Sequence, residues 1–167
     1  MIQQHPDPAT PQRQRVAQHV YGPFAPPDPT TPVGQILARR LREELFIWLT
    51  TIDENAVPQP LPVTFLWDEA QATFLTYSRT DRGRLADIER NPNVALHFDV
   101  IGGDIIILTG EATVSVDDPP SDQVAAWVEK YSALLARLGM SAKQSAESAS
   151  VPLRIRPLTL RYAQNPT

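Results

Sequence analysis

The segment from Tyr77 to Arg84 carries the residue types that a phosphate-binding site needs. Within eight positions it contains two hydroxyl side chains, three arginines and a glycine, namely Ser78, Thr80, Arg79, Arg82, Arg84 and Gly83. A predicted strand ends in this segment and a predicted helix begins there, and the first turn of a helix offers free N–H groups to an anion. Guanidinium forks match pairs of phosphate oxygens. The pattern therefore predicts a phosphate-bearing ligand, with a solvated arginine-rich surface as the alternative.

Other types of reactive site are missing from the sequence. The chain has no cysteine, which excludes disulfides, iron–sulfur clusters and thiol nucleophiles. Its three histidines, His5, His19 and His97, do not have the spacing of a metal site, and we expect His97 to be a structural strand residue. There is no Gly-x-Ser-x-Gly elbow and no glycine-rich nucleotide loop. If the chain catalyses a reaction, a bound cofactor is expected to supply the reactive atoms.

Length and composition fit a single globular domain. The chain has 167 residues, of which 42% are hydrophobic, and these numbers predict one domain with a substantial core. With 15 basic and 19 acidic residues the net charge is −4, which argues against a nucleic-acid-binding protein. No apolar run reaches the length of a membrane span, and the first ten residues do not resemble a secretory signal. We expect a cytoplasmic protein without a membrane or nucleic-acid partner.

Hydrophobic periodicity predicts a mainly β protein with accessory helices. Six strands are expected, over residues 46–52, 57–67, 72–78, 93–99, 104–116 and 151–162. Helices are expected from Pro32 to Leu45, from Asp81 to Arg90 and from Pro119 to Leu138. Most connections are short, which favours an antiparallel sheet. Gly110 and a change in the apolar phase at Pro157 predict bulges that bend this sheet into a small barrel.

Two groups of prolines shape the chain. Eight of the 17 prolines fall within residues 1–32, and we therefore interpret residues 1–31 as a proline-rich arm and residues 32–167 as the folded domain. In the second predicted strand the prolines are spaced two apart, at Pro58, Pro60 and Pro62. Their missing N–H groups would all point to the same side, so that side cannot carry a regular ladder of hydrogen bonds. We expect a sheet edge, a bulge or a docking site there.

Some prominent side chains have structural interpretations. Trp127 and Tyr131 lie on the apolar face of the third predicted helix and are expected to pack in the core or at a subunit interface. Arg154 and Arg156 alternate along the last strand, which predicts a solvated or interface-forming face. None of these four residues is expected to have a chemical role.

Five short motifs occur in the order that is found in a known family. They are Trp48-Leu49-Thr50-Thr51, Pro62-Val63-Thr64-Phe65-Leu66-Trp67-Asp68, Tyr77-Ser78-Arg79, Asn91-Pro92-Asn93-Val94-Ala95-Leu96-His97 and Gly102-Gly103-Asp104. With them, the chain resembles the pyridoxamine 5'-phosphate oxidase-like, FMN-binding split-barrel proteins over residues 41–161. It is most similar to the branch of reductases that depend on a deazaflavin, coenzyme F-420.

The resemblance implies a six-stranded antiparallel split β-barrel that forms a homodimer, with two cofactor sites at the subunit interface. The strand-to-helix segment holds the cofactor phosphate in this family, which implies cofactor-binding roles for Tyr77, Ser78, Arg79, Thr80, Arg82 and Arg84. It also implies that the cofactor ring lies beside Pro62, Val63 and Thr64. Two residues depart from the family pattern: Arg84 replaces a lysine and keeps the charge, and Asp87 replaces an asparagine and adds a negative charge one turn away.

The function that the resemblance implies is hydride transfer from reduced coenzyme F-420 to a small organic acceptor. FMN is the alternative cofactor, because both ligands combine a tricyclic ring with a phosphate and the segment from Tyr77 to Arg84 cannot distinguish them. A non-catalytic protein that binds a flavin or a tetrapyrrole is the other alternative, since no residue is identified as a general acid or base. We assign no metal ligand and no catalytic residue.

Overall fold

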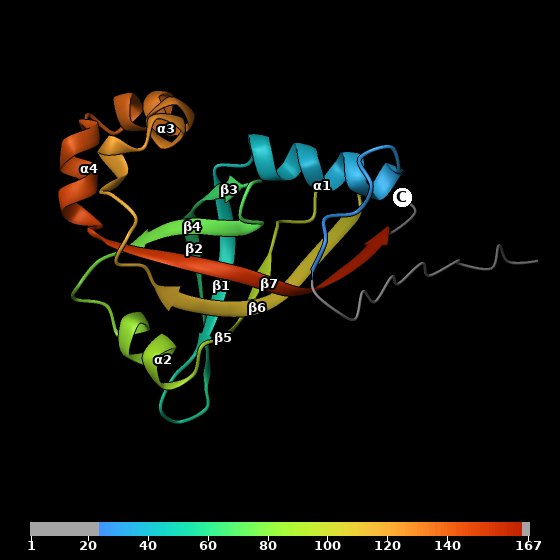
Figure 1. The fold of residues 1–167 in the computed structure, drawn as a ribbon, viewed down its shortest axis with the longest axis horizontal. Helices are drawn as coiled ribbons and strands as arrows, with labels where there is room; N and C mark the ends of the chain where they lie inside the picture. Colours follow the sequence, from blue (N-terminus) through green and yellow to red (C-terminus); the bar gives the residue numbers. More distant parts are fainter. Residues whose placement is uncertain (1–23, 165–167) are drawn as a thin grey trace, which may run out of the picture.

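Seven antiparallel strands form one curled sheet in the computed structural model, which describes residues 24–164 (Figure 1). The strands are β1 (Phe46–Ile52), β2 (Pro58–Thr64), β3 (Leu66–Asp68), β4 (Thr73–Ser78), β5 (Asn93–His97), β6 (Asp104–Val114) and β7 (Val151–Gln164). Their order across the sheet is β2-β1-β5-β6-β7-β4-β3. The expected class, mainly β with accessory helices, is confirmed, whereas the expected number of six strands is wrong by one. Residues 1–23 of the predicted arm lie outside the described residues.

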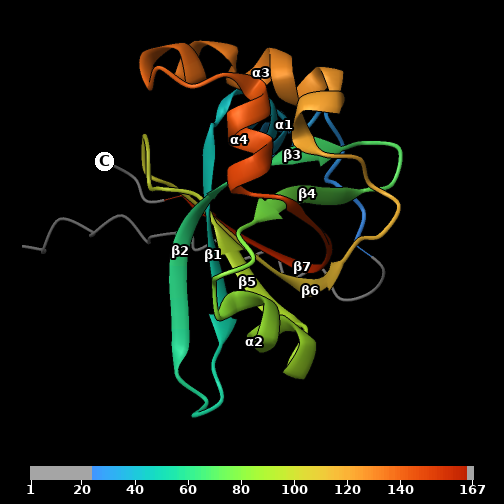
Figure 2. The same cartoon turned by 90° about the vertical axis from the view of Figure 1, so that its left-hand side faces the viewer.

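Within the described part of the chain, four α-helices surround the sheet. They are α1 (Pro32–Glu43), α2 (Arg84–Arg90), α3 (Ala125–Arg137) and α4 (Ala142–Ser148). The helices α1, α3 and α4 lie toward one end of the sheet, and α2 lies at the other end beside β1 and β6 (Figure 2). None of these four helices is long and apolar enough to span a membrane.

The helix boundaries follow local capping. Thr31 caps α1, as its position before Pro32 predicts, because its hydroxyl accepts from the N–H of Gly34 at 3.1 Å. A 3-10 turn over Ser121–Gln123 replaces the first part of the expected helix 119–138. The helix α4 is not among the predicted helices, although a capping box formed by Ser141 and Gln144 begins it.

The seventh strand arises because the predicted strand 57–67 bends at Phe65. The Phe65 side chain is fully buried, and its backbone N–H donates to the hydroxyl of Tyr131 on α3 at 2.7 Å. Before the bend β2 pairs with β1, and after it β3 pairs with β4. The two edges of the sheet are therefore consecutive in the chain. Near the bend, the Thr76 hydroxyl donates to the Thr64 carbonyl at 2.6 Å, so β4 and β2 are neighbours and the sheet curls back on itself.

The strand β2 forms one edge of the sheet, as its three prolines predict. The carbonyl of Val57 accepts from the N–H of Asp53 at 3.0 Å. With this pairing, the backbone N–H and C=O groups of the odd-numbered residues of β2 point toward β1. The backbone groups of the even-numbered residues then point to the free side of the strand, where no N–H donor is needed. These residues include Pro58, Pro60 and Pro62. At these three positions the edge offers carbonyl acceptors and no donor.

A bulge bends the long antiparallel pair of β6 and β7. The register shifts so that Thr109 faces Thr159 while Gly110 faces Pro157, which leaves one extra residue on β7. A side chain at Gly110 would place its Cβ 2.5 Å from the carbonyl oxygen of Arg156, and so only glycine fits there. The bulge predicted from Gly110 and Pro157 is confirmed.

Two clusters of buried side chains use the two faces of β4. The larger cluster fills the inside of the curled sheet and includes Leu49, Phe65, Phe74, Leu96 and Leu153. The smaller cluster lies between β4 and α3 and consists of Leu75, Tyr77, Trp127 and Tyr131. Trp127 and Tyr131 are therefore core residues, one of the two roles predicted for them.

We predict that Tyr131→Phe lowers the free energy of unfolding by about 2–4 kcal/mol, because buried backbone groups lose their partner. The hydroxyl accepts from the Phe65 N–H. It lies 2.8 Å from the carbonyl oxygen of Leu45 and 2.8 Å from that of Phe65, and it can donate its single proton to either of them. Urea unfolding measures the loss. Tyr77→Phe is the control, since that hydroxyl has one partner, the Pro119 carbonyl, and a loss of about 1 kcal/mol is expected. Equal losses in the two variants would contradict the role given to Tyr131.

Candidate functional site

The predicted phosphate-binding segment is a connection between β4 and α2. The strand ends at Ser78, and α2 begins at Arg84 instead of at Asp81. Residues 79–83 therefore form an exposed turn, and no side chain caps the helix. The three arginines of the segment consequently lie in different surroundings, on the turn and on the first residue of α2.

Two of the three arginines are exposed and lie near the same carboxylate. Arg79 donates to the two carboxylate oxygens of Asp81 through Nε at 3.0 Å and through Nη2 at 3.0 Å. These hydrogen bonds lower the pKa of Asp81 and raise that of Arg79. Arg82 lies 4.0 Å from the same carboxylate. A phosphate that binds Arg79 would compete with Asp81 for this guanidinium or use the donors that Asp81 leaves free.

Arg84 is half-buried and is not paired with a carboxylate. Burial, together with the nearby charge of Arg82, lowers the pKa of Arg84. The ion pairs found within residues 24–164 do not include Arg84. A cation that has lost water without gaining an anion is costly for a folded protein. Arg84 is therefore the strongest candidate for an anion-binding group in this segment.

Asp87 does not neutralise Arg84. Its side chain is 9% exposed, and it accepts a long hydrogen bond of 3.5 Å from the hydroxyl of Thr51 on β1. Its other oxygen lies 3.4 Å from the guanidinium of Arg90 on the next turn of α2. The carboxylate of Asp87 therefore interacts with Thr51 of β1 and with Arg90 of α2.

The strand alternation separates Tyr77 from Ser78. The Tyr77 hydroxyl donates to the Pro119 carbonyl at 2.8 Å, and its ring packs on Trp127 with the centroids 4.8 Å apart. Burial raises the pKa of Tyr77 to about 12. Ser78 is 2% exposed, and its hydroxyl lies 3.3 Å from the Arg79 carbonyl, to which it donates. Thr80 lies on the exposed turn. A ligand on the Ser78 side could reach Tyr77 only through its backbone.

The three residues predicted to lie beside a cofactor ring occupy the end of β2. Pro62 is exposed and pairs in register with Trp48, whereas Val63 is buried and points into the core. Thr64 is half-buried, and its carbonyl accepts from Thr76 of β4. The predicted ring contacts and the predicted phosphate contacts therefore come from two strands that touch.

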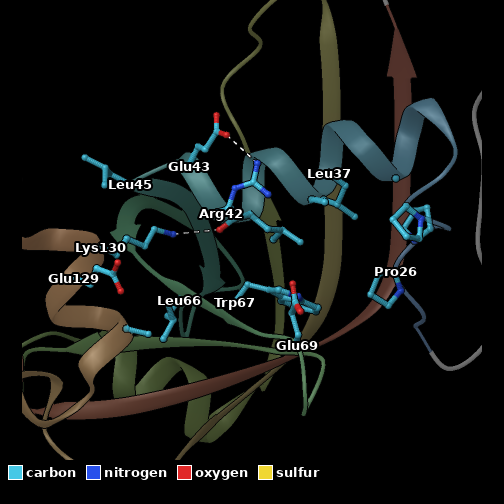
Figure 3. A pocket seen from close by; sticks show the side chains of 16 residues that line it. Pro26, Leu37, Arg42, Glu43, Leu45, Leu66, Trp67, Glu69, Glu129 and Lys130 are labelled. Atoms are coloured by element: carbon cyan, nitrogen blue, oxygen red, sulfur yellow. Dashed lines mark hydrogen bonds and ion pairs between the residues drawn. The ribbon is translucent and has the colours of Figure 1, made fainter.

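Two cavities lie elsewhere, and none of the nine predicted site residues lines them. A cavity of about 760 Å³ lies between α1, β3 and α3 (Figure 3), and one of about 500 Å³ lies on the other side of β3. The larger one is walled by Leu37, Leu41, Leu45, Leu66 and Trp67, with Lys130 among them. Sequence analysis did not identify this cavity, because its walls come from segments more than 80 residues apart. The one available signal is that Lys130 and Lys143 are the only lysines of the chain.

The surroundings of Arg154 differ from the expectation of a solvated or interface-forming face. Its guanidinium donates to Asp118 at 2.7 Å, to Asp68 at 2.8 Å and to Thr73 at 3.0 Å, and the two aspartates raise its pKa. It therefore ties the segment before α3 to the β3–β4 hairpin. Arg156 is exposed, as expected, and pairs with Glu111 at 2.6 Å. Within residues 24–164, no group of three His, Asp or Glu side chains is placed to bind a metal ion.

A curled antiparallel sheet, closed by a strand that bends between its two edges, is the architecture of a split-barrel protein. The family model described as pyridoxamine 5'-phosphate oxidase matches residues 35–163. The chain belongs to this family. A search of curated protein sequences found no match.

Solved structures of several functional descriptions are similar to this fold. An F-420 reductase is 20% identical, with 73% of this chain and 94% of that chain covered and a TM-score of 0.52. General stress protein 26 from Bacillus anthracis is 18% identical, with 77% and 92% covered and a TM-score of 0.57. HutZ, a heme storage protein from Vibrio cholerae, is 13% identical, with 74% and 88% covered and a TM-score of 0.51. At these identities the similarity establishes the fold alone.

We predict that Arg84→Met leaves the free energy of unfolding of the ligand-free protein unchanged or raises it. The substitution removes a half-buried charge that no carboxylate compensates and keeps an unbranched apolar side chain in place of the arginine stem. Arg154→Met is the comparison, because it breaks two ion pairs and should cost about 3 kcal/mol or more. Urea unfolding of both variants tests this. A loss above about 1 kcal/mol in Arg84→Met would mean that Arg84 has a structural role.

Proposed function

We propose that this protein is an oxidoreductase that binds a phosphate-bearing flavin-type cofactor and transfers a hydride from reduced coenzyme F-420 to a small organic acceptor. The observation that carries the proposal is the half-buried, unpaired guanidinium of Arg84 where β4 leads into α2. A phosphate at this position would provide the missing counter-charge. Membership of the pyridoxamine 5'-phosphate oxidase family and the similarity to an F-420 reductase support the cofactor class.

The phosphate end of the site would use groups on both sides of the turn. Arg84 would bind the phosphate from α2, and Arg82 would add a second charge from the exposed turn. The hydroxyl of Thr80 would donate to a phosphate oxygen, and the hydroxyl of Ser78 would do so on giving up the Arg79 carbonyl to which it donates. Arg79 would join with the donors that its pairing with Asp81 leaves free.

The ring end of the site would lie along β2. Pro62 offers an exposed ring and a free carbonyl acceptor at the strand edge, with the half-buried Thr64 after it, whereas Val63 supports this edge from the core. When bound, the reduced deazaflavin supplies the hydride. The residues of this chain would hold the phosphate, fix the ring against β2 and exclude water from one face of it, which leaves the other face for the acceptor.

We also propose that a second copy of the chain covers the outer face of the sheet. On β1, β5 and β6 this face carries Trp48, Ile52, His97, Ile105 and Ile107, all partly exposed. The rings of Trp48 and His97 stack with centroids 5.9 Å apart and planes 6° apart. The solvated face of an antiparallel sheet is normally polar, so the large apolar side chains on this face, beside Thr50 and Thr109, favour a homodimer.

We predict that Arg84→Ala weakens cofactor binding by about 10- to 150-fold, which corresponds to the 1.5–3 kcal/mol of a charged hydrogen-bonded contact. Fluorescence titrations of the purified protein with F-420 and with FMN measure the affinities. Arg137→Ala, on the exposed last turn of α3, is the matched control and should bind as the wild type does. Unchanged affinity in Arg84→Ala would remove Arg84 from the site.

These titrations, together with a turnover assay and a titration with heme, separate the alternatives. Tight binding of FMN and weak binding of F-420 would replace the deazaflavin by a flavin. Binding without oxidation of reduced F-420 by any of a panel of quinones and activated olefins would favour a non-catalytic binder. Tight binding of heme alone would favour the role that the heme storage protein from Vibrio cholerae has by its description.

We predict that Ile107→Lys converts a homodimer into a folded monomer. The lysine would stand on the outer face of β6, where it can reach water in the monomer and is unfavourable against an apolar partner. Light scattering after size-exclusion chromatography gives the mass. Val116→Lys is the control, because Val116 is 91% exposed and lies after β6. A wild-type protein that is monomeric at micromolar concentration would refute the dimer.

A further inference from the structure

The cavity between α1, β3 and α3 has the size and walls of a small-molecule site. Its volume of about 760 Å³ falls in the range of 300–1,000 Å³ that is usual for ligand pockets. Leu37 and Leu41 of α1 and Leu66 of β3 line it, and the Trp67 ring closes one side (Figure 3). The segment of Pro26, Pro27 and Pro29 forms a further wall. The elements that line the cavity lie at the end of the sheet opposite to α2, on which Arg84 stands.

The proline segment is held firmly against α1. The Asp28 carbonyl accepts from the N–H of Thr31 at 2.9 Å, and a Cβ at Gly34 would lie only 2.0 Å from the Asp28 carbonyl oxygen. Phe24 packs edge-on against Trp67, with ring centroids 6.2 Å apart. These contacts fix the wall before any ligand is bound, so the cavity is preformed.

A single half-buried cation lies on this apolar wall. The Lys130 ammonium donates to the Leu41 carbonyl at 3.3 Å and lies 3.8 Å above the centroid of the Phe65 ring. An ammonium has three donors, and the second and third have no hydrogen-bond partner among the described residues. The ion pairs within residues 24–164 do not include Lys130. Burial lowers the pKa of Lys130 to about 8, and only the charge of Glu44 opposes this.

The acidic side chains around the cavity are at its rim. Glu43, Glu69 and Glu129 line the cavity but are exposed to solvent, and Glu43 is paired with Arg42 at 3.0 Å. Water screens charges at such positions far more than it screens a group that is half-buried among leucines. The electrostatic preference inside the cavity is therefore set by Lys130.

We propose that this cavity binds an amphipathic ligand with an apolar body and one carboxylate, and that the carboxylate pairs with Lys130. The apolar body would replace water along the leucine wall and the Trp67 ring. The carboxylate would accept from the free donors of the ammonium and stabilise its charged form. This proposal uses none of the residues of the cofactor site.

The test compares decanoate with decan-1-ol, which share the apolar chain and differ in the charged group. Titration calorimetry at pH 7 measures both affinities for the wild type, for Lys130→Met and for Lys143→Met. Lys143 is the matched control, since it is exposed on α4 and does not line the cavity. We expect Lys130→Met to bind decanoate at least about tenfold more weakly and decan-1-ol with unchanged affinity, and Lys143→Met to behave as the wild type does.

A fluorescence experiment locates the ligand. Bromine quenches indole emission at short range, so 10-bromodecanoate should quench the wild type, and Trp67→Phe should remove most of this quenching because Trp48 and Trp127 do not line the cavity. Raising the pH from 7 to 10 should weaken decanoate binding in the wild type as Lys130 loses its proton. In Lys130→Met the same pH change should have no effect.

Three outcomes would overturn the proposal. The first is no saturable binding of decanoate by the wild type up to about 1 mM. The second is an equal loss of decanoate and decan-1-ol affinity in Lys130→Met, which would leave Lys130 only its structural contact with the end of α1. The third is quenching that persists in Trp67→Phe. Lys130→Arg should keep the preference for decanoate, which provides a charged variant if Lys130→Met does not fold.

Discussion

The bend at Phe65 is the constraint on which the rest of the structure depends. One stretch of chain has to serve as both edges of the sheet, so its backbone must leave one partner strand and join another within two residues. At the bend the N–H of Phe65 cannot take part in either ladder, and the Tyr131 hydroxyl supplies its partner. The same hydroxyl lies next to the Leu45 carbonyl, just before β1. One side chain therefore ties the start of β1, the turning point of the barrel and the helix α3 together.

The charged side chains of the protein divide into two groups. Most arginines within residues 24–164 are exposed or paired, for example Arg40 with Glu44, and Arg154 with Asp68 and Asp118. Arg84 and Lys130 are the two described cations that are neither exposed nor paired with a carboxylate. They lie at opposite ends of the sheet. A folded chain tolerates such groups when their charge serves a ligand, which is the common physical basis of the two binding sites proposed for this protein.

The strands were accessible from the sequence because each has a strong local signal. Gly110 and Pro157 mark the bulge by their own backbone chemistry, and the prolines of β2 mark an edge. The division of the strand 57–67 was not accessible, because it depends on a hydroxyl that is 66 residues away in the sequence. The residues of the turn after β4 could be identified from the sequence, but not which arginine is free. Which arginine is free depends on the hydrogen bonds of Arg79 to Asp81 and on the hydrogen bond of Thr51 to Asp87.

The edge formed by β2 also bears on how copies of this chain can meet in a crowded solution. Two such edges placed side by side would present carbonyl oxygens to carbonyl oxygens at Pro58, Pro60 and Pro62, with no hydrogen atom between them. Continuous sheets that run from molecule to molecule, as in fibrils, are thereby disfavoured at a strand that is otherwise exposed and apolar. The prolines thus protect the protein from one-dimensional aggregation while the carbonyls stay available to a partner that brings its own donors.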